Sequence, residues 1–142
     1  MTRPACALRA ASPADIDDLI ALWREAAENS GRPTDTRAGV TELLRRDPAA
    51  VIVAEHDGDL VGSIIAGWDG WRCHLYRLAV RRDWRRRGVA SALLHAAEDR
   101  FRALGAARID AMVLDSNDLG QHVWQARGYR RQDDWRRWVK KL

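Results

Sequence analysis

The hydrophobic and polar positions of this chain alternate between the spacing of helices and the spacing of strands, which predicts an α/β domain. Four stretches carry apolar residues on one helical face. They run from Ser12 to the stop at Asn29, from the loop after Asp35 to Asp47, from Val89 to Leu104, and from Leu119 to Arg127. Short apolar runs between turn residues predict strands. These cover residues 6–10, 51–55, 60–66, 75–80 and 108–114, and a tryptophan-rich hairpin at the C-terminal end adds two more.

Length and composition agree with one domain over residues 1–142. With 46% hydrophobic and 31% charged residues, the chain can bury its own core. No apolar run is long enough for a membrane span, and the start lacks a signal-peptide core, so we expect a cytoplasmic protein. Cys6 and Cys73 have no metal-ligand spacing. We expect both to be buried thiols in a reducing cytosol, and we expect no metal site.

The most informative segment runs from Leu78 to Ser91, where a strand passes through an arginine-rich turn into a helix. The first N–H groups of a helix lack intrahelical partners, and the positive end of the helix dipole lies there, which favours an anion. The small residues Gly88 and Ala90 let an anion approach the main chain. Three arginines, at 85 to 87, add charge and paired donors. The segment therefore predicts a phosphate or pyrophosphate site.

The turn contains neither a P-loop nor a dinucleotide-binding glycine motif. Arg85-Arg86-Arg87-Gly88-Val89-Ala90 instead resembles the acyl-CoA motif [QR]-x-x-G-x-[GA] of the GCN5-related N-acetyltransferase (GNAT) superfamily. Asn117 follows the next strand, where that superfamily commonly has an asparagine that contacts coenzyme A, and Gly128-Tyr129 falls where its second motif ends. The resemblance extends over nearly the whole chain. Within the superfamily the chain resembles the bacterial ribosomal-protein-alanine acetyltransferase-like group.

This resemblance implies the GNAT fold, a mixed sheet of about seven strands flanked by about four helices, and acetyl-CoA as co-substrate. It also implies a reaction, the transfer of an acetyl group to a primary amine of a small molecule, protein or peptide by direct attack in a ternary complex. The backbone N–H near Leu78 would stabilise the thioester oxyanion. The residues implied to bind the coenzyme are Leu78, Ala79, Val80, Arg85, Arg86, Arg87, Gly88, Val89, Ala90, Ser91 and Asn117.

His74 is the first candidate for the base that takes the proton of the amine, because some GNAT members carry a catalytic Glu or His at the matching position. Strand alternation predicts that His74 lies on the same face as Tyr76 and Leu78. The alternative is a polar residue near the start of a strand. Tyr76 and Asp115 are weaker candidates, since each could equally be a packed aromatic or a loop cap.

Trp124 stands where many relatives have a tyrosine close to the coenzyme sulfur. An indole N–H donates a hydrogen bond but cannot transfer a proton as an acid, so departure of the thiolate would be unaided or assisted by water. The alternative is that Trp124 only packs under its short helix.

The acceptor site is predicted from two regions. One is the loop between the first two helices, from Asn29 to Thr36, which is a variable wall in this fold. The other is a turn whose Trp68, Asp69 and Trp71 could hold a cationic amine through charge and cation–π contact. The alternative for this second region is a plain turn with packed tryptophans.

Two further functions stay open. The formal net charge of +4 invites a nucleic-acid-binding module, but the arginines are spread along the chain and acids interrupt the basic C-terminal tail, so we expect no nucleic-acid partner. The tryptophan at the acid position also leaves room for a catalytically weak acyl-CoA-binding protein. We expect a coenzyme A thioester and an amine as partners, no membrane association and a possible homodimer.

Overall fold

The computed structural model of the protein describes residues 5–28 and 34–142. It divides into two compact units, one that ends at Met112 and one that covers Val113–Leu142. Each unit is described by itself. That the two units form a single domain stays a prediction.

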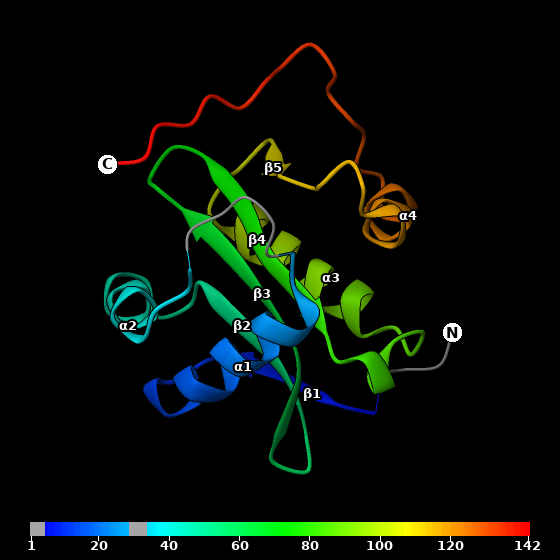
Figure 1. The fold of residues 1–142 in the computed structure, drawn as a ribbon. Coiled ribbons are helices and arrows are strands. Elements are labelled where there is room, and N and C mark those ends of the chain that lie inside the picture. Colours follow the sequence, from blue (N-terminus) through cyan, green and yellow to red (C-terminus); the bar gives the residue numbers. More distant parts are fainter. Residues whose placement is uncertain (1–4, 29–33) are drawn as a thin grey trace. The chain divides into compact units, whose positions relative to one another are not determined.

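The first unit contains a five-stranded sheet and three helices (Figure 1). Its elements are β1 (Ala7–Ala10), α1 (Ile16–Ala26), α2 (Arg37–Arg46), β2 (Val51–His56), β3 (Asp59–Trp68), β4 (Cys73–Val80), α3 (Val89–Ala103) and β5 (Ile109–Ala111). Short 3-10 turns at Pro13–Asp15 and Arg82–Trp84 precede α1 and α3. The second unit contains α4 (Asp118–Ala126). All four predicted helices and the first four predicted strands are thus confirmed, and the fifth strand is confirmed only over Ile109–Ala111 of the predicted residues 108–114.

The prediction of a C-terminal hairpin is wrong. Residues 127–142 form no strand, so the sheet has five strands instead of about seven. The sequence of this tail explains the difference, because Trp135 and Trp138 are three positions apart and charged residues separate them. A strand with one buried face needs apolar residues at every second position.

The strands lie in the order β1-β2-β3-β4-β5. Pairing is antiparallel from β1 to β4, and only β4 and β5 run parallel. The predicted hairpin turn between β2 and β3 is confirmed. Asp57 and Gly58 both have positive φ angles, of 49° and 84°, which is the conformation that a two-residue hairpin turn requires.

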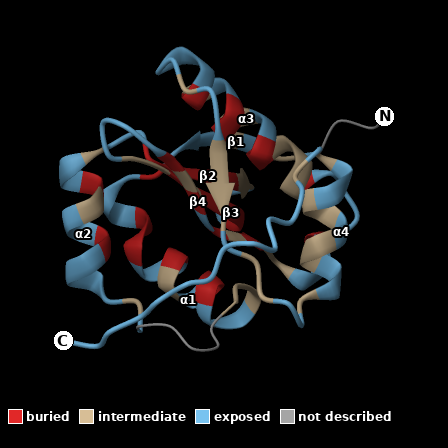
Figure 2. Ribbon diagram, turned by 90° about the horizontal axis from the view of Figure 1, so that it is seen from above, coloured by how far each residue is buried: buried red, intermediate tan, exposed pale blue. Residues whose placement is uncertain are grey.

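Helices α1 and α3 cover opposite faces of the sheet, as two neighbouring residues of β3 demonstrate. The Trp23 indole of α1 donates a hydrogen bond of 2.8 Å to the Ser63 hydroxyl. A Cβ atom added to Gly62 would instead approach Val89 of α3 at 2.9 Å. Successive strand residues point to opposite faces, so the two helices lie on opposite sides (Figure 1). In Figure 2 the buried positions of α1, α2 and α3 gather on the sides that face the sheet.

Expectations from the sequence concern the cysteines and membrane-spanning helices. Both cysteines are free thiols, and Cys73 is buried while Cys6 is only partly buried, so the expectation of two buried thiols holds for Cys73 alone. Among the described residues, no helix has the length and apolar character that crossing a membrane would take. The cytoplasmic location stays a prediction.

Candidate active site

Strand β4 carries a bulge in its middle. Tyr76 pairs with Ile65 of β3, but the next pair joins Ala79 to Ser63, so a step of two residues on β3 matches a step of three on β4. Arg77 takes up the extra residue with a φ of 51°, a left-handed conformation that is uncommon for a side chain of this size. Neither Arg77 nor Leu78 has a register partner on β3.

The bulge corrects the prediction that His74, Tyr76 and Leu78 share one face. Residues paired across two strands lie on the same face, and so do residues two apart on one strand. Tyr76 and Ala79 therefore share a face, because their partners Ile65 and Ser63 are two apart. It follows that Leu78 points to the opposite face, which is the side of α3. Simple alternation fails here because the bulge adds one residue.

The two aromatic rings that precede the bulge lie on the α1 face. Ser63 defines this face through its hydrogen bond with Trp23. The ring centroids of His74 and Tyr76 are 6.0 Å apart and tilted by 46°. His74 is half-buried, whereas Tyr76 is 47% exposed. An imidazole and a phenol thus stand together next to the bulge, accessible to a substrate.

The edge of β4 toward β5 is open beyond the first three residues. Parallel pairing joins Cys73–Leu75 to Ile109–Ala111, and within the described part of the chain β4 has no partner strand beyond Leu75 on this side. The main-chain groups of Leu78, Ala79 and Val80 consequently lie on a stretch of β4 that β5 does not cover. An extended ligand could pair with this edge as an added strand.

The arginine-rich turn presents main-chain N–H groups at the start of α3. Arg86 and Gly88 have φ angles of 61° and 79°, and such alternating left-handed residues form concavities that bind anions. No atom would lie within 4 Å of a Cβ added to Gly88, so the space before the helix is open. Val89 opens a helix of 15 residues whose first N–H groups carry no side-chain cap. These features fit a pyrophosphate group.

The arginines of the turn have different surroundings. The Nε atom of Arg85 donates to the Val80 carbonyl at 3.4 Å, which ties the turn to the end of β4. The guanidinium of Arg87 lies 4.7 Å from the ring centroid of Trp84, a buried residue of the preceding 3-10 turn. Arg85, Arg86 and Arg87 are all exposed and can reach an anion in solution.

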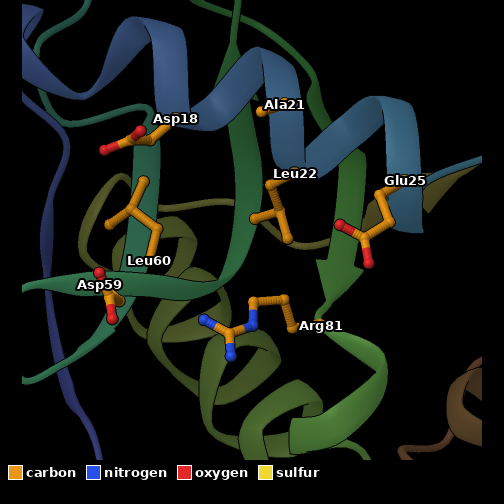
Figure 3. Close-up of a pocket in the computed structure, with 7 residues that line it drawn as sticks. All are labelled: Asp18, Ala21, Leu22, Glu25, Asp59, Leu60 and Arg81. Atoms are coloured by element: carbon orange, nitrogen blue, oxygen red, sulfur yellow. The ribbon is translucent and has the colours of Figure 1, made fainter.

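Arg81 belongs to a different region, a pocket between α1 and the start of β3 (Figure 3). Its Nη2 atom pairs with Asp83 at 2.6 Å, and the pocket is also lined by the carboxylates of Asp18, Glu25 and Asp59. Three carboxylates against one paired arginine repel anions. The pocket is therefore no part of a phosphate site.

The Asp69 carboxylate, which was predicted to bind an amine, accepts hydrogen bonds within the turn between β3 and β4. The Oδ1 atom of Asp69 accepts hydrogen bonds from the backbone N–H of Trp71 at 2.8 Å and of Arg72 at 2.6 Å. These donors, Arg72 first, hold the pKa of Asp69 below its ordinary value. The guanidinium of Arg72 lies 4.7 Å from the Trp71 ring centroid, so a cation of the chain itself contacts that face. Trp68 ends β3, half-buried. This geometry favours the alternative of a plain turn.

In the second unit, two predicted site residues stabilise local structure. The Asn117 side chain accepts a hydrogen bond of 2.8 Å from the Gly120 N–H and thereby caps α4. Asp115 lies 3.6 Å from Arg131 in an ion pair. Asp115 is thus better explained as a loop residue than as a base. A contact between Asn117 and coenzyme A stays a prediction.

Trp124 packs edge-on against Tyr129 in the same unit. Their ring centroids are 5.0 Å apart at an interplanar angle of 81°, and the Tyr129 N–H donates to the Trp124 carbonyl at 3.0 Å. This contact gives the tryptophan a packing role within its own unit. Whether its indole also acts near the coenzyme sulfur is a separate prediction.

Sequence reasoning did not single out Arg77. It is the only charged residue between His74 and Val80, and its side chain is 2% exposed. A lone arginine inside an apolar strand was the available signal, because arginine is almost never fully buried without a partner.

Comparisons with known proteins bear on the family and the fold of this chain. The pattern of the Acetyltransferase (GNAT) family matches residues 16–129. An acetyltransferase of Sodalis glossinidius is 36% identical over 84% of this chain and 83% of its own length. The crystal structure of Ard1 from Thermoplasma volcanium is 27% identical, with a TM-score of 0.73, over 87% of this chain and 82% of that one.

A further solved structure bears on the fold alone. The aminoglycoside N-acetyltransferase AAC(6')-Iy, in complex with CoA, has a TM-score of 0.80 at 22% identity and covers 99% of this chain and 98% of its own. Together the matches confirm three predictions from the sequence: the α/β GNAT fold, an N-acetyltransferase enzyme, and acetyl-CoA as its co-substrate.

Proposed function

Because the chain belongs to the acetyltransferase (GNAT) family, we propose that it moves the acetyl group of acetyl-CoA to a primary amine by direct attack in a ternary complex. One observation carries this proposal, namely that the open edge of β4 leads directly into the anion-binding turn of α3. A coenzyme with an extended pantetheine arm and a pyrophosphate matches both features. That the acceptor is an amine rests on the family, and which amine it is belongs to the proposal.

The coenzyme is held mainly by main-chain groups. N–H groups from Arg85 to Ser91 bind the pyrophosphate at the positive end of the α3 dipole, and the exposed arginines neutralise its charge. The pantetheine amides pair with the main chain of Leu78, Ala79 and Val80 along the open edge. A contact between Asn117 and the coenzyme is implied by the family resemblance and stays a prediction.

The chain's own groups provide the chemistry of the transfer. His74 takes a proton from the ammonium form of the acceptor, so that a neutral amine can form a bond to the thioester carbonyl carbon. The N–H of Leu78, which lies outside the β3 register, donates to the carbonyl oxygen as negative charge develops there. The C–S bond then breaks, the nitrogen of the intermediate gives its extra proton to water, and water protonates the departing thiolate. Trp124, at the position where the resemblance implies a tyrosine, cannot supply that proton as an acid.

We propose an exposed amine of a peptide or a small molecule as acceptor. Support comes from the 47% exposure of Tyr76 beside His74, which leaves this part of the site open to a bulky substrate. The resemblance to the ribosomal-protein-alanine acetyltransferase-like group favours a protein N-terminus within that class. The homodimer is likewise only proposed.

A thiol-release assay over a panel of peptide N-termini, lysine peptides and small diamines tests the function. We expect release of coenzyme A with at least one amine class, and none without an amine. If no amine gives release although acetyl-CoA binds, the chain is a catalytically weak acyl-CoA-binding protein and the proposed function is wrong.

The base is tested by removing the imidazole of His74 first and the hydroxyl of Tyr76 second. His74→Ala should lower kcat/KM by about a hundredfold or more while coenzyme affinity stays near normal. His95, an exposed residue of α3 that pairs with Asp99 at 3.3 Å, gives the matched control His95→Ala, which should leave the rate unchanged. Activity of His74→Ala within a few-fold of wild type would transfer the role to Tyr76, which Tyr76→Phe examines.

A further inference from the structure

Arg77 is buried at the bulge of β4, where its side chain reaches toward α1. Its guanidinium carbon lies 5.7 Å from the ring centroid of Trp23, a fully buried residue of that helix. Its side chain is only 2% exposed. A buried cation is costly unless it is paired and hydrogen-bonded, so its partners indicate what the residue is for.

These partners lie at the two ends of the connection between α1 and α2. The Nη1 atom donates to the carbonyl of Glu28, just after α1, at 2.7 Å. The Nη2 atom forms an ion pair with the carboxylate of Asp35, just before α2. One planar guanidinium therefore holds both ends of this connection to the middle of β4. The predicted acceptor wall spans Asn29–Thr36, of which residues 29–33 lie outside the described part of the chain.

The same residue is also fixed through its main chain. The Ser63 hydroxyl donates to the Arg77 carbonyl at 3.1 Å and itself accepts from the Trp23 indole at 2.8 Å. The next residue along the chain is Leu78, the proposed oxyanion donor. A displacement of the connection between α1 and α2 would therefore move the Arg77 side chain. Arg77 precedes Leu78, so this movement would occur directly beside the proposed reacting centre.

We infer that Arg77 is a positioning residue that clamps the ends of α1 and α2, at Glu28 and Asp35, to the strand that holds the thioester. The inference rests on the proposed function, in which the amine approaches on the α1 face beside His74 and Tyr76, and it names the contact that fixes the ends of α1 and α2 on that face. The side chain contacts Glu28, Asp35 and Trp23 on the α1 side of the strand. Loss of the clamp should therefore impair use of the amine and spare coenzyme binding.

Arg77→Gly separates the side chain from the backbone. Glycine adopts the φ of 51° without a steric penalty, so the bulge keeps its shape while the clamp is lost. Asp35→Asn is the milder variant, since it keeps the volume and removes one charge. Asp17→Asn is the control, because Asp17 forms an ion pair with Arg37 of α2 in which the two side chains are 77% and 62% exposed.

The kinetic test compares the amine with acetyl-CoA. We expect kcat/KM for the amine to fall about a hundredfold in Arg77→Gly and about tenfold in Asp35→Asn, with no change in Asp17→Asn. The Kd of acetyl-CoA, measured by calorimetry, should stay within about threefold of wild type in all three. Unchanged amine kinetics in both clamp variants would overturn the inference, and so would a parallel loss of coenzyme affinity, which indicates general damage to the strand.

Amide hydrogen exchange decides the matter independently of activity. In Arg77→Gly, residues 22–28 and 34–40 should exchange faster than in wild type, while Asp17→Asn leaves them unchanged. If no amine is acetylated by the wild type, the proposed function fails, but faster exchange at these two segments still supports the clamp. Equal exchange in wild type and Arg77→Gly would refute it.

Discussion

A negative charge at Gly88 should weaken coenzyme binding without unfolding the protein. Gly88 precedes α3, has a φ of 79° and faces open space where we place the pyrophosphate. A glutamate there brings a carboxylate to within a few ångströms of the phosphates. At about 4 Å each pair of like charges costs about 1 kcal/mol in water and about 4 kcal/mol at an effective dielectric constant of 20. The Kd should therefore rise by at least about fivefold, and by several hundredfold if the turn excludes water.

The positive φ adds a separate cost in stability. A side chain in the left-handed region costs about 1–2 kcal/mol relative to glycine, which lowers the Tm of a chain of this length by about 3–8 °C. Gly105, at the other end of α3, provides the matched comparison, because its φ is 82° and an added Cβ would also meet no atom within 4 Å. Gly88→Ala and Gly105→Ala should lose similar stability.

Calorimetry with acetyl-CoA on Gly88→Glu, Gly88→Ala and Gly105→Glu then isolates the charge at the turn. Only Gly88→Glu should lose binding, and only there should added acetyl-CoA fail to raise the Tm. The assignment of the phosphate site is wrong if Gly88→Glu, folded by circular dichroism, binds acetyl-CoA as tightly as Gly105→Glu does.

Three further predictions concern local contacts. The Arg9 guanidinium lowers the pKa of Asp15 to about 2 in the folded protein. The stability that this carboxylate contributes is complete above its unfolded pKa near 3.8 and is lost as the pH falls toward 2. Urea titrations should therefore show a loss of about 1–2 kcal/mol over this pH range in wild type and none in Asp15→Asn. Trp84→Leu removes the ring beside the neighbouring arginine of the turn and should weaken acetyl-CoA binding about two- to fivefold by calorimetry, whereas Trp84→Phe should bind normally. Gly120→Ala places a Cβ against the Asn117 amide and should cost about 1 kcal/mol, with no further loss on adding Asn117→Ala if the damage is to that cap.

The elements that could be predicted are those whose signals are local. The strand before the arginine turn, the hairpin at Asp57-Gly58 and the helix after Gly88 each carry their own apolar period and turn residues. The turn before α3 could likewise be predicted, because its glycine and arginines are contiguous in the sequence, whereas the phosphate that it is proposed to bind stays a prediction. The missing hairpin shows the limit of this reasoning, since tryptophans without a two-residue period do not specify a strand.

The site beyond the turn depends on contacts that are distant in sequence. Arg77 meets Asp35 across 42 residues and Glu28 across 49, and no local pattern indicates either partner. The turn at Asp69 could be read in two ways from its residues, as an amine site or as a side-chain cap. Only the two backbone donors at its carboxylate favour the cap.

In the proposed reaction, the bulge of β4 lets one strand serve two substrates on opposite sides. In a strictly alternating strand, His74, Tyr76 and Leu78 would share a face, and their main-chain groups would all point toward the same neighbouring strand. The extra residue at Arg77 removes Leu78 from that register and turns its side chain toward α3, while the two rings stay on the α1 face. In the proposed reaction an amine then approaches from the α1 side toward a carbonyl held at the open edge, and the buried side chain at the bulge also fixes the ends of α1 and α2 on that side, at Glu28 and Asp35.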